Sequence, residues 1–329
     1  MDTIKIGIDI GYSAVKVRGN GVRASFPSVV GTPDRSRFSL STDDSVVIEK
    51  GGQFFLVGQA AIEQSRFTHR REDRAWITSE EYSVLMLAAF SEVVSEPVNE
   101  VVIVTGLPAA FYESDKEELR SKFIGTHTVA RDGRRSQQVN VRECRVIPQH
   151  FGTVLHAALN DKGDVASVAI STGRVGVIDI GGKTTGILSV YRMSEVSRET
   201  ASVNVGGWDV VRQMRNWLTA NCPNLDLRDH EIANAIANRR VSYYGKAIDL
   251  SEPVSEVGAN LAEQIIATAT QLWSSAAKLD TILITGGGAT LLGESIASKM
   301  QQAVVIDDPV EANVNGYWKF AIRVSQGQK

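Results

Sequence analysis

Apolar residues along the chain follow two kinds of spacing, one typical of strands and one typical of helices. The first 60 residues hold short apolar runs separated by Gly, Pro and Asp, as in successive strands joined by turns. From residue 79 to residue 94, apolar positions recur at helical spacing. The pattern predicts strands at 4–10, 14–18, 21–26, 46–49, 54–57, 101–104 and 141–147, helices at 79–94, 113–123 and 150–159, and a hairpin across Asp132-Gly133.

The segment "NDKGD" at 160–164 is the best candidate for a boundary between two halves. After it, the pattern predicts three strands in succession, then mostly helices, then one more strand. Each half opens with strands and adds strand–helix units later, an order that predicts two related α/β domains with mixed sheets. The strands of the second half are expected at 165–171, 175–180, 184–190 and 281–284, and its helices at 207–220, 229–238 and 255–277.

One short sequence occurs twice. "IDIG" stands at 8–11 and again at 178–181, 170 residues later, and each copy leads from an apolar strand into a turn. The second copy continues into Gly182-Lys183-Thr184, which is how a phosphate-binding P-loop ends. Val177 stands where that loop requires Gly, however, so the segment is not a P-loop. The chain instead uses a different device once in each half.

The first copy has the residue types of an anion site. A hairpin turn at Gly11-Tyr12-Ser13 can aim several backbone N–H groups at one point, and Gly11 lets a phosphate approach closely. Asp9 would repel a phosphate unless a cation lay between them, and Mg²⁺ suits that place because it binds through a carboxylate plus phosphates. Lys16 could add positive charge. A single copy alone is better explained by a strand that ends at an exposed Asp-Gly turn, and it is the second copy that favours an anion site.

Three glycine-rich segments of the second half could complete such a site. The second copy offers the open turn Gly181-Gly182, with Thr184 and Thr185 as hydroxyl donors, whereas Lys183 is equally explained as a solvated side chain. "TGGG" at 285–288 follows a strand and precedes a helix, whose N-terminus favours an anion. "NVGGWD" at 204–209 introduces a helix through Gly206 and Gly207, which an ordinary helix start would also explain.

Composition is that of an ordinary globular protein. Of 329 residues, 43% are hydrophobic and 22% charged, and the net charge of −3 gives no general attraction to nucleic acid or anionic membranes. Cys144 and Cys222 are too few for a disulfide framework, a four-thiolate zinc site or an iron–sulfur cluster. The N-terminus is not signal-like and no apolar stretch reaches about 18 residues. We therefore expect a cytoplasmic protein with no membrane span and two buried thiols.

The ordered set of motifs resembles the actin, Hsp70 and sugar-kinase ATPase superfamily. The set comprises Asp9-x-Gly11, "TGLP" at 105–108, "IPQHFGT" at 147–153 and the three glycine-rich segments, and it covers nearly the whole chain. "FPSVVG" at 26–31, "TGLP" after a strand and the terminal "EANVNGYWKFA" at 311–321 are similar to the plasmid-segregation actins of the ParM or StbA family.

This resemblance implies two actin-like (ribonuclease H-like) domains, with mixed sheets, flanking a cleft that holds a nucleotide and Mg²⁺. The first domain would take residues 1–163 and a C-terminal helix at 309–329, and the second would take 164–308. The nucleotide would be ATP, with GTP as an open alternative. Asp9 would lie near the metal, and Asp179 near the γ-phosphate and its water shell, holding the metal through water. Gly286-Gly287-Gly288 would lie against the adenosine.

The resemblance also implies a role for Gln149, which stands where the family places a residue that orients the attacking water. An amide is not a base at neutral pH, so its part would be positioning, and phosphoryl transfer needs little beyond positioning and charge neutralisation. The simpler alternative is a residue exposed between Pro148 and a helix. The family's second phosphate motif often ends in Asp, whereas this chain has Gly186. For the purine, Glu231 and Asn234 are the candidates.

Three functions remain open on the sequence. The first is a filament-forming ATPase whose monomers add head to tail with ATP bound, whose filament is loosened by hydrolysis, and which reaches plasmid DNA through an adaptor protein rather than directly. The second is a small-molecule kinase of the same superfamily. Such a kinase needs a general base for the substrate hydroxyl, and Asp115 is poorly placed for this role because it lies on a predicted surface helix. The third is a pilus-assembly or division-site relative. Such proteins often carry a membrane-targeting tail, whereas "RVSQGQK" at 323–329 is short and polar.

Overall fold

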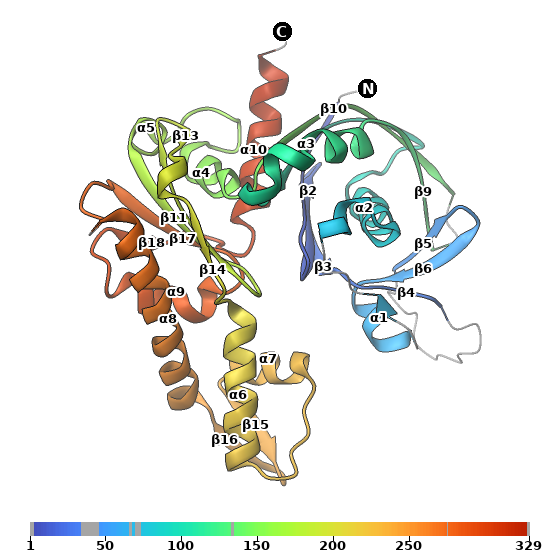
Figure 1. The fold of residues 1–329 in the computed structure, drawn as a ribbon. Coiled ribbons are helices and arrows are strands. Elements are labelled where there is room, and N and C mark those ends of the chain that lie inside the picture. The colour runs from blue at the N-terminus through green and yellow to red at the C-terminus, as the bar shows by residue number, and fades with distance from the viewer. Residues whose placement is uncertain are drawn as a thin grey trace. The chain divides into compact units, whose positions relative to one another are not determined.

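The computed structural model describes residues 3–33, 46–65, 68–69, 74–132, 135–274 and 276–327. Its contacts divide the chain into two compact units. Unit 1 holds residues 1–166 together with 313–329, and unit 2 holds residues 167–312 (Figure 1). Both termini therefore belong to unit 1, and unit 2 is an insertion into it. Each unit has a mixed sheet with helices packed on it, as the sequence predicts.

Unit 1 is built on one long sheet whose strand order is β3-β2-β1-β8-β10-β9-β5-β6-β4-β7. At its centre, β1 pairs antiparallel with β2 and parallel with β8, which in turn pairs parallel with β10. The strands are β1 (Ile4–Ile10), β2 (Ala14–Gly19), β3 (Val22–Pro27), β4 (Val30–Gly31), β5 (Val46–Lys50), β6 (Gln53–Val57), β7 (Thr68–His69), β8 (Val98–Leu107), β9 (Gly125–Arg131) and β10 (Gln137–Pro148).

The sheet of unit 1 curls round helix α2 (Glu80–Val93), which lies inside the curve in Figure 1. This helix contacts strands from both ends of the strand order, including β3, β6 and β9. Its buried residues, among them Tyr82, Leu85 and Phe90, face several directions, as expected for a helix enclosed by a core. Ser79 begins the helix by accepting a hydrogen bond from the Tyr82 N–H at 3.1 Å. The remaining helical segments on this part are α1 (Gln59–Gln64), η1 (Arg74–Thr78), α3 (Ala109–Phe123) and α4 (Phe151–Ala158).

The C-terminal helix α10 (Ala312–Gln326) packs on the other face of β1 and β8. Side chains alternate between the two faces of a strand, so Ile6 and Ile8 join the core around α2 while Gly7 faces α10. A Cβ at Gly7 would lie 2.5 Å from the Val314 carbonyl oxygen, so the close approach of helix and strand requires glycine there.

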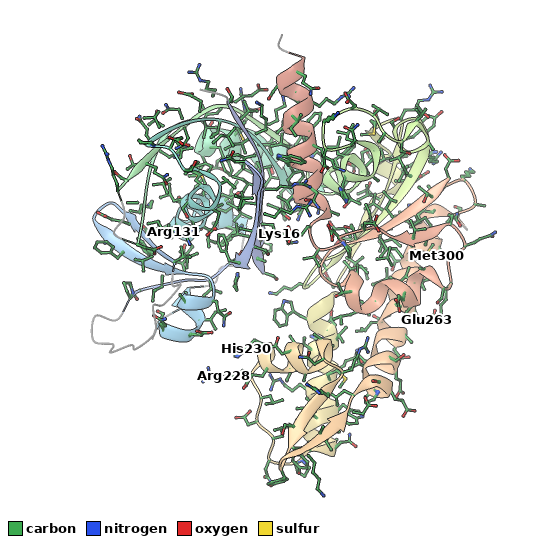
Figure 2. The ribbon with its side chains drawn as sticks, turned by 180° about the vertical axis from the view of Figure 1, so that it is seen from behind. Lys16, Arg131, Arg228, His230, Glu263 and Met300 are labelled. Carbon is green, nitrogen blue, oxygen red and sulfur yellow. The ribbon has the colours of Figure 1, made fainter. Side chains whose placement is uncertain are left out.

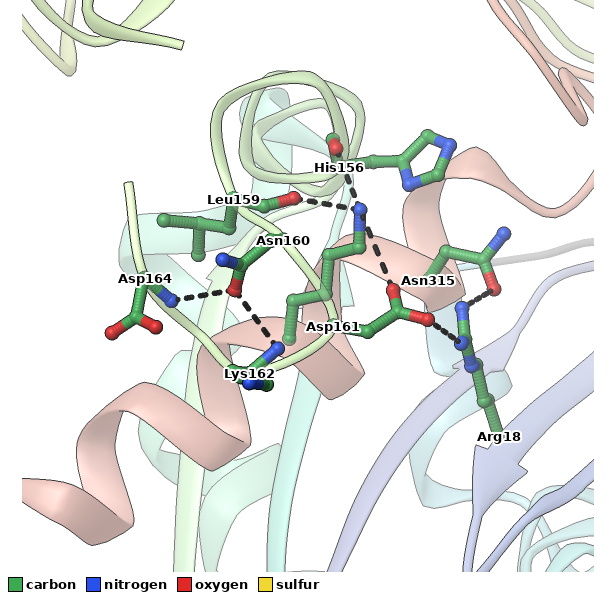
Figure 3. A network of polar contacts seen from close by, with 9 residues as sticks. Arg18, His156, Leu159, Asn160, Asp161, Lys162, Asp164 and Asn315 are labelled. Atoms are coloured by element: carbon green, nitrogen blue, oxygen red, sulfur yellow. Dashed lines mark hydrogen bonds and ion pairs between the residues drawn. The ribbon is translucent and has the colours of Figure 1, made fainter. Parts of the chain in front are cut away.

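A polar network fixes α10 to β2 and to the turn after α4 (Figure 3). Arg18 donates to Asn315 Oδ1 at 2.7 Å and to Asp161 Oδ2 at 3.2 Å, and its guanidinium lies 3.8 Å from the centre of the Trp318 ring. Lys319 donates to the Leu159 carbonyl at 2.7 Å, and burial lowers the pKa of this lysine. Because Arg18 and Lys319 are each 7% exposed, their bonds to Asn315 and to the Leu159 carbonyl are made largely out of contact with water, whereas the Asp161 side chain is exposed.

Unit 2 has a sheet in the order β13-β12-β11-β17-β18, with β14 paired to β12, and a separate β15–β16 hairpin. Helices α6, α8 and α9 share one apolar core with the sheet. The elements are α5 (Val168–Thr172), β11 (Arg174–Ile180), β12 (Thr185–Tyr191), β13 (Ser194–Glu195), η2 (Ser197–Glu199), β14 (Ala201–Val203), α6 (Gly207–Asn221), α7 (Asp229–Ala237), β15 (Arg240–Tyr243), β16 (Lys246–Asp249), α8 (Ser251–Trp273), β17 (Thr281–Thr285), α9 (Ala289–Ala297) and β18 (Ala303–Val305).

One predicted element of unit 2 is wrong. The expected strand at 165–171 is replaced by the short helix α5, which begins after Ser167. The Ser167 hydroxyl accepts a hydrogen bond from the Ile170 N–H at 3.3 Å, so a side-chain cap competes successfully with strand formation. Val168 is 67% exposed, and its apolar side chain therefore gives no packing energy that would favour a strand.

The predicted hairpin is confirmed as an antiparallel pair of β9 and β10. Of its predicted turn, Gly133 lies outside the described residues. Asp132 has a left-handed φ of 53°, and its carboxylate accepts a hydrogen bond from the Val47 N–H at 2.7 Å. Within the part of the chain that the structure describes, no helix combines the length and apolar character needed to cross a bilayer.

Both cysteines are buried, as predicted. Burial raises the pKa of the Cys144 thiol to about 12, so the thiol stays protonated near neutral pH, and a protonated thiol is a poor nucleophile. We expect the native protein at pH 8 to react very slowly with an aromatic disulfide reagent, and both thiols to react at once in guanidinium. Rapid release of one equivalent of chromophore from the native protein would contradict this expectation.

Candidate functional site

In unit 1, the first "IDIG" segment forms a tight hairpin between β1 and β2. The Gly11 N–H donates to the Ala14 carbonyl at 3.1 Å, and the Ser28 hydroxyl donates to the Gly11 carbonyl at 2.6 Å. The Trp76 indole N–H lies 3.4 Å from the Ile10 carbonyl, and its ring centre lies 5.9 Å from that of Tyr12. The turn is thus held from outside by Ser28, which follows β3, and by Trp76 of η1, while Ser13 is exposed at its tip.

Asp9 stands at the carboxyl end of β1 and is 6% exposed. Its cross-strand partner on β2 is Lys16, labelled in Figure 2, so both side chains stand on the same face of the sheet. Gln149 Nε2 lies 3.5 Å from Asp9 Oδ1, a long contact. The structure therefore brings together Asp9, Lys16 and Gln149 from among the residues singled out in the first half of the chain.

The charge of Asp9 also affects Tyr82, a buried residue of α2 in the core of unit 1. Burial raises the pKa of Tyr82 well above its ordinary value, and the electrostatic effect of the neighbouring Cys144 and Asp9 raises it further. Tyr82 consequently stays neutral over the whole useful pH range and acts as a packing residue.

In unit 2, the three glycine-rich segments converge at the end of β11. The Gly207 N–H donates to the Gly181 carbonyl at 2.9 Å, and the Trp208 N–H donates to the Gly182 carbonyl at 2.8 Å. The Gly288 N–H donates to the Ile180 carbonyl at 2.8 Å. Backbone bonds therefore join segments that are up to about a hundred residues apart in sequence.

Asp179 occupies the centre of this arrangement. Its carboxylate packs against the turn after β17, because a Cβ at Gly286 would lie 2.5 Å from Asp179 Oδ1 and 2.4 Å from the Ile180 carbonyl oxygen. Gly286 also has a left-handed φ of 90°, which glycine adopts at no steric cost. Gly287 differs from its neighbour, since a Cβ there would have nothing within 4 Å.

The two hairpins are built alike. The Gly181 N–H donates to the Thr184 carbonyl at 2.9 Å, which repeats the bond from Gly11 to Ala14. In register, Asp9 faces Lys16 across the first hairpin and Asp179 faces Gly186 across the second. A Cβ at Gly186 would have nothing within 4 Å, so this position leaves open space beside the Asp179 carboxylate.

The other predicted residues of unit 2 lie in more exposed positions. Lys183 and Thr184 are exposed on the second turn. The expectation for Thr185 is wrong, because this residue is buried and donates its hydroxyl to the Val205 carbonyl at 2.7 Å. Glu231 is exposed and caps α7, accepting a hydrogen bond from the Arg228 N–H at 2.7 Å (Arg228 is labelled in Figure 2). Asn234 lies one turn further along α7 and is also exposed.

Sequence reasoning missed the residues that support these turns. Asp209 accepts a hydrogen bond from the Gly206 N–H at 2.8 Å and so fixes the start of α6; the segment "NVGGWD" contains this signal, as an acidic residue three positions after a helix start. Ser28 lies within "FPSVVG", a segment that stands out in the sequence only through its similarity to the plasmid-segregation actins. Trp76 gave no signal, because its bond to the Ile10 carbonyl depends on tertiary structure.

Comparison with family models gives matches to both parts of the chain. The model described as "Actin like proteins N terminal domain" matches residues 7–152, and the model described as "Archaeal actin homologue MreB-like, C-terminal" matches residues 177–298. The chain is an actin-like protein. The two matched ranges each contain one copy of the repeated hairpin. A comparison with curated proteins found no match.

Solved structures show the same actin-like fold over nearly the whole length. An archaeal actin homologue, Ta0583, superposes with a TM-score of 0.85 at 21% identity, covering 98% of this chain and 100% of the homologue. The apo pSK41 ParM protein gives a TM-score of 0.81 at 19% identity, with 99% of each chain covered. A subunit of a 15-stranded ParM filament from Clostridium botulinum gives 0.79 at 24% identity, covering 98% of this chain and 99% of the subunit.

No group of three or more His, Cys, Asp or Glu side chains in the described ranges is placed to hold a metal ion. The actin-like protein therefore presents two single carboxylates, Asp9 and Asp179, each at a strand end beside a glycine turn.

Proposed function

We propose that this actin-like protein is a nucleotide-dependent ATPase that polymerises into filaments and serves plasmid or DNA segregation. The observation that carries the proposal is the repeated hairpin, in which an Asp at a strand end stands beside an open glycine turn once in each unit. One neighbour in fold, Ta0583, has been solved as a complex with ADP, and two others, a ParM and Alp12, as filaments.

In this proposal, the two turns bind the phosphates of ATP. Gly11, Tyr12, Ser13 and Lys16 would take one side, and Gly181, Gly182, Lys183 and Thr184 the other. Gly206 and Gly207 would lie along the sugar and Gly286-Gly287-Gly288 against the adenosine, with Glu231 and Asn234 toward the purine. A Cβ added at Gly287 or Gly186 would meet nothing within 4 Å, so the backbone at both glycines borders open space, as a backbone that lies against a ligand requires.

Magnesium fits the carboxylates that are present. Mg²⁺ usually keeps several waters and binds through one or two carboxylates plus substrate phosphates. Asp9 would lie on the metal side and Asp179 would hold the water shell at the γ-phosphate; when bound, the metal would neutralise phosphate charge. The contact between Gln149 Nε2 and Asp9 Oδ1 at 3.5 Å is long enough to be exchanged for a water or a phosphate oxygen.

Filament formation would use head-to-tail contacts between copies of the chain. Heterologous contacts of this kind give open filaments when the rotation between subunits does not close. Hydrolysis would change the relation between the domains 1–163 with 309–329 and 164–308, and would thereby loosen the filament. With a net charge of −3, the protein would leave DNA contact to a separate adaptor protein and would act in the cytoplasm.

The test is polymer formation measured by light scattering and by sedimentation. We expect both signals to rise when Mg-ATP is added, to stay at baseline with Mg-ADP, and to decay as phosphate is released. Mg-GTP in a parallel sample shows which nucleotide is preferred. Absence of polymer with every nucleotide, together with ADP release that depends on an added sugar, would instead support a small-molecule kinase.

A further inference from the structure

Two glycines of unit 1 form a slot for the ring of Tyr317, which is fully buried on α10. A Cβ at Gly106 would lie 2.0 Å from Tyr317 Oη, and a Cβ at Gly152 would lie 2.7 Å from Tyr317 Cε1. Gly106 belongs to "TGLP" and Gly152 to "IPQHFGT", while Tyr317 belongs to the terminal "GYW". Three sequence motifs are thus explained by one packing contact.

The hydroxyl at the end of this ring reaches the backbone of Gln149. Tyr317 Oη donates to the Gln149 carbonyl at 2.9 Å, and the Gly152 N–H donates to the same oxygen at 3.0 Å. On its other side, the Gln149 N–H donates to the Leu107 carbonyl at 2.7 Å, which extends the pairing of β8 with β10. The backbone of Gln149 is therefore held by β8, α4 and α10 together.

Only the side chain of Gln149 is left free to adapt, and it already points toward Asp9. A group that orients a reacting molecule must be held to within a fraction of an ångström, since small misplacements cost much of the rate. A restraint on the backbone at Gln149 therefore acts on the direction of its side-chain amide.

We propose that Tyr317 is a positioning residue for ATP hydrolysis, acting through its hydrogen bond to the Gln149 carbonyl. The inference rests on the proposed function, ATP hydrolysis, and on the role of orienting the attacking water that the family resemblance implies for Gln149. The ring of Tyr317 fills the slot and supports stability, whereas the hydroxyl fixes the peptide that follows Gln149. The two contributions are separable, because phenylalanine keeps the ring and removes only the hydroxyl.

The first experiment compares Tyr317→Phe with wild-type protein in phosphate release at saturating Mg-ATP. We expect kcat to fall about fivefold to tenfold, the rate equivalent of one ordinary hydrogen bond, with nucleotide affinity changed less than about twofold. Ser325→Ala is the matched control, because it also removes a hydroxyl from α10, one that donates to the Ala321 carbonyl at 2.8 Å. It is expected to match wild type.

A double-mutant cycle then separates positioning from a general effect on structure. In a Gln149→Ala background, adding Tyr317→Phe should lower kcat by less than about twofold, because the residue through which Tyr317 acts is gone. A full further decrease in the double variant would overturn the inference. Equal kcat for Tyr317→Phe and wild type, with the variant folded, would overturn it as well.

Hydrogen exchange supplies a readout that does not depend on hydrolysis. Amides of residues 149–153 should exchange about fivefold faster in Tyr317→Phe than in wild type, and Ser325→Ala should leave them unchanged. Unchanged exchange rates in Tyr317→Phe would show that the Tyr317 hydroxyl does not restrain the backbone at Gln149. If wild-type protein binds but does not hydrolyse ATP, the proposed function fails together with the effect on kcat, while faster exchange would still support the restraint on Gln149.

Discussion

Replacing Asp179 with Asn is expected to lower the steady-state rate of ATP hydrolysis by about 100-fold or more, the usual effect of removing one group that orders charge at a reaction centre. The substitution keeps size and shape, so the packing of the side chain against Gly286 should survive. It removes the negative charge that would order the water shell of Mg²⁺ at the γ-phosphate. Filaments formed with ATP should consequently persist longer, which the decay of light scattering measures.

Asp226→Asn is the control for this experiment, because Asp226 is an exposed carboxylate of the same unit in the loop before α7. It removes the same charge from the unit and should leave turnover unchanged. If the turnover of Asp179→Asn stays within about threefold of wild type, Asp179 does not have the proposed role of ordering the water shell at the γ-phosphate.

The second large effect concerns Gly286. An alanine there would have to adopt a φ of 90° and would bring its Cβ to 2.4 Å from the Ile180 carbonyl oxygen. Backbone strain and overpacking each cost about 1–3 kcal/mol, so we expect unit 2 to lose about 4 kcal/mol of unfolding free energy. For a unit of this size, the unfolding midpoint should fall by on the order of 10 °C. Thermal unfolding followed by intrinsic tryptophan fluorescence measures this change.

Gly287→Ala provides a matched comparison one residue away, since its Cβ would meet nothing within 4 Å. We expect the unfolding midpoint to stay within about 2 °C of wild type, because neither strain nor overlap is introduced. Nucleotide affinity should nevertheless fall, because the added methyl group would stand where the adenosine is proposed to lie. Equal midpoints for the two alanine variants would show that the turn relaxes at little cost.

The sequence carried enough information for the arrangement within each unit. Repetition of "IDIG" predicted matching hairpins, and the register places Asp9 and Asp179 at equivalent points of them. Periodicity located α2 because the apolar residues recur along its whole length, and the apolar run at 101–104 proved to be part of the central strand β8. In both cases a local pattern and the tertiary environment agree.

Other features could not be predicted because they depend on contacts between distant segments. The slot for Tyr317 joins residues 106, 152 and 317, and no local pattern marks glycines that must be small for a ring elsewhere in the chain. The bond from Trp76 to the Ile10 carbonyl is of the same kind. At 165–171, a short apolar run was compatible with either state, and the hydroxyl of Ser167 decided in favour of a helix.

The position of α10 has a consequence for how the protein is made. Residues 313–329 belong to unit 1, and Tyr317 and Ala321 are fully buried in it, yet the ribosome makes them only after the whole of unit 2. Domains generally fold as units during synthesis, so the inserted unit can be finished while the N-terminal one still lacks its last helix. Until α10 has been made, the apolar face around Val104 stays uncovered. A nascent chain that lacks α10 therefore exposes apolar surface of unit 1 while unit 2 is already complete.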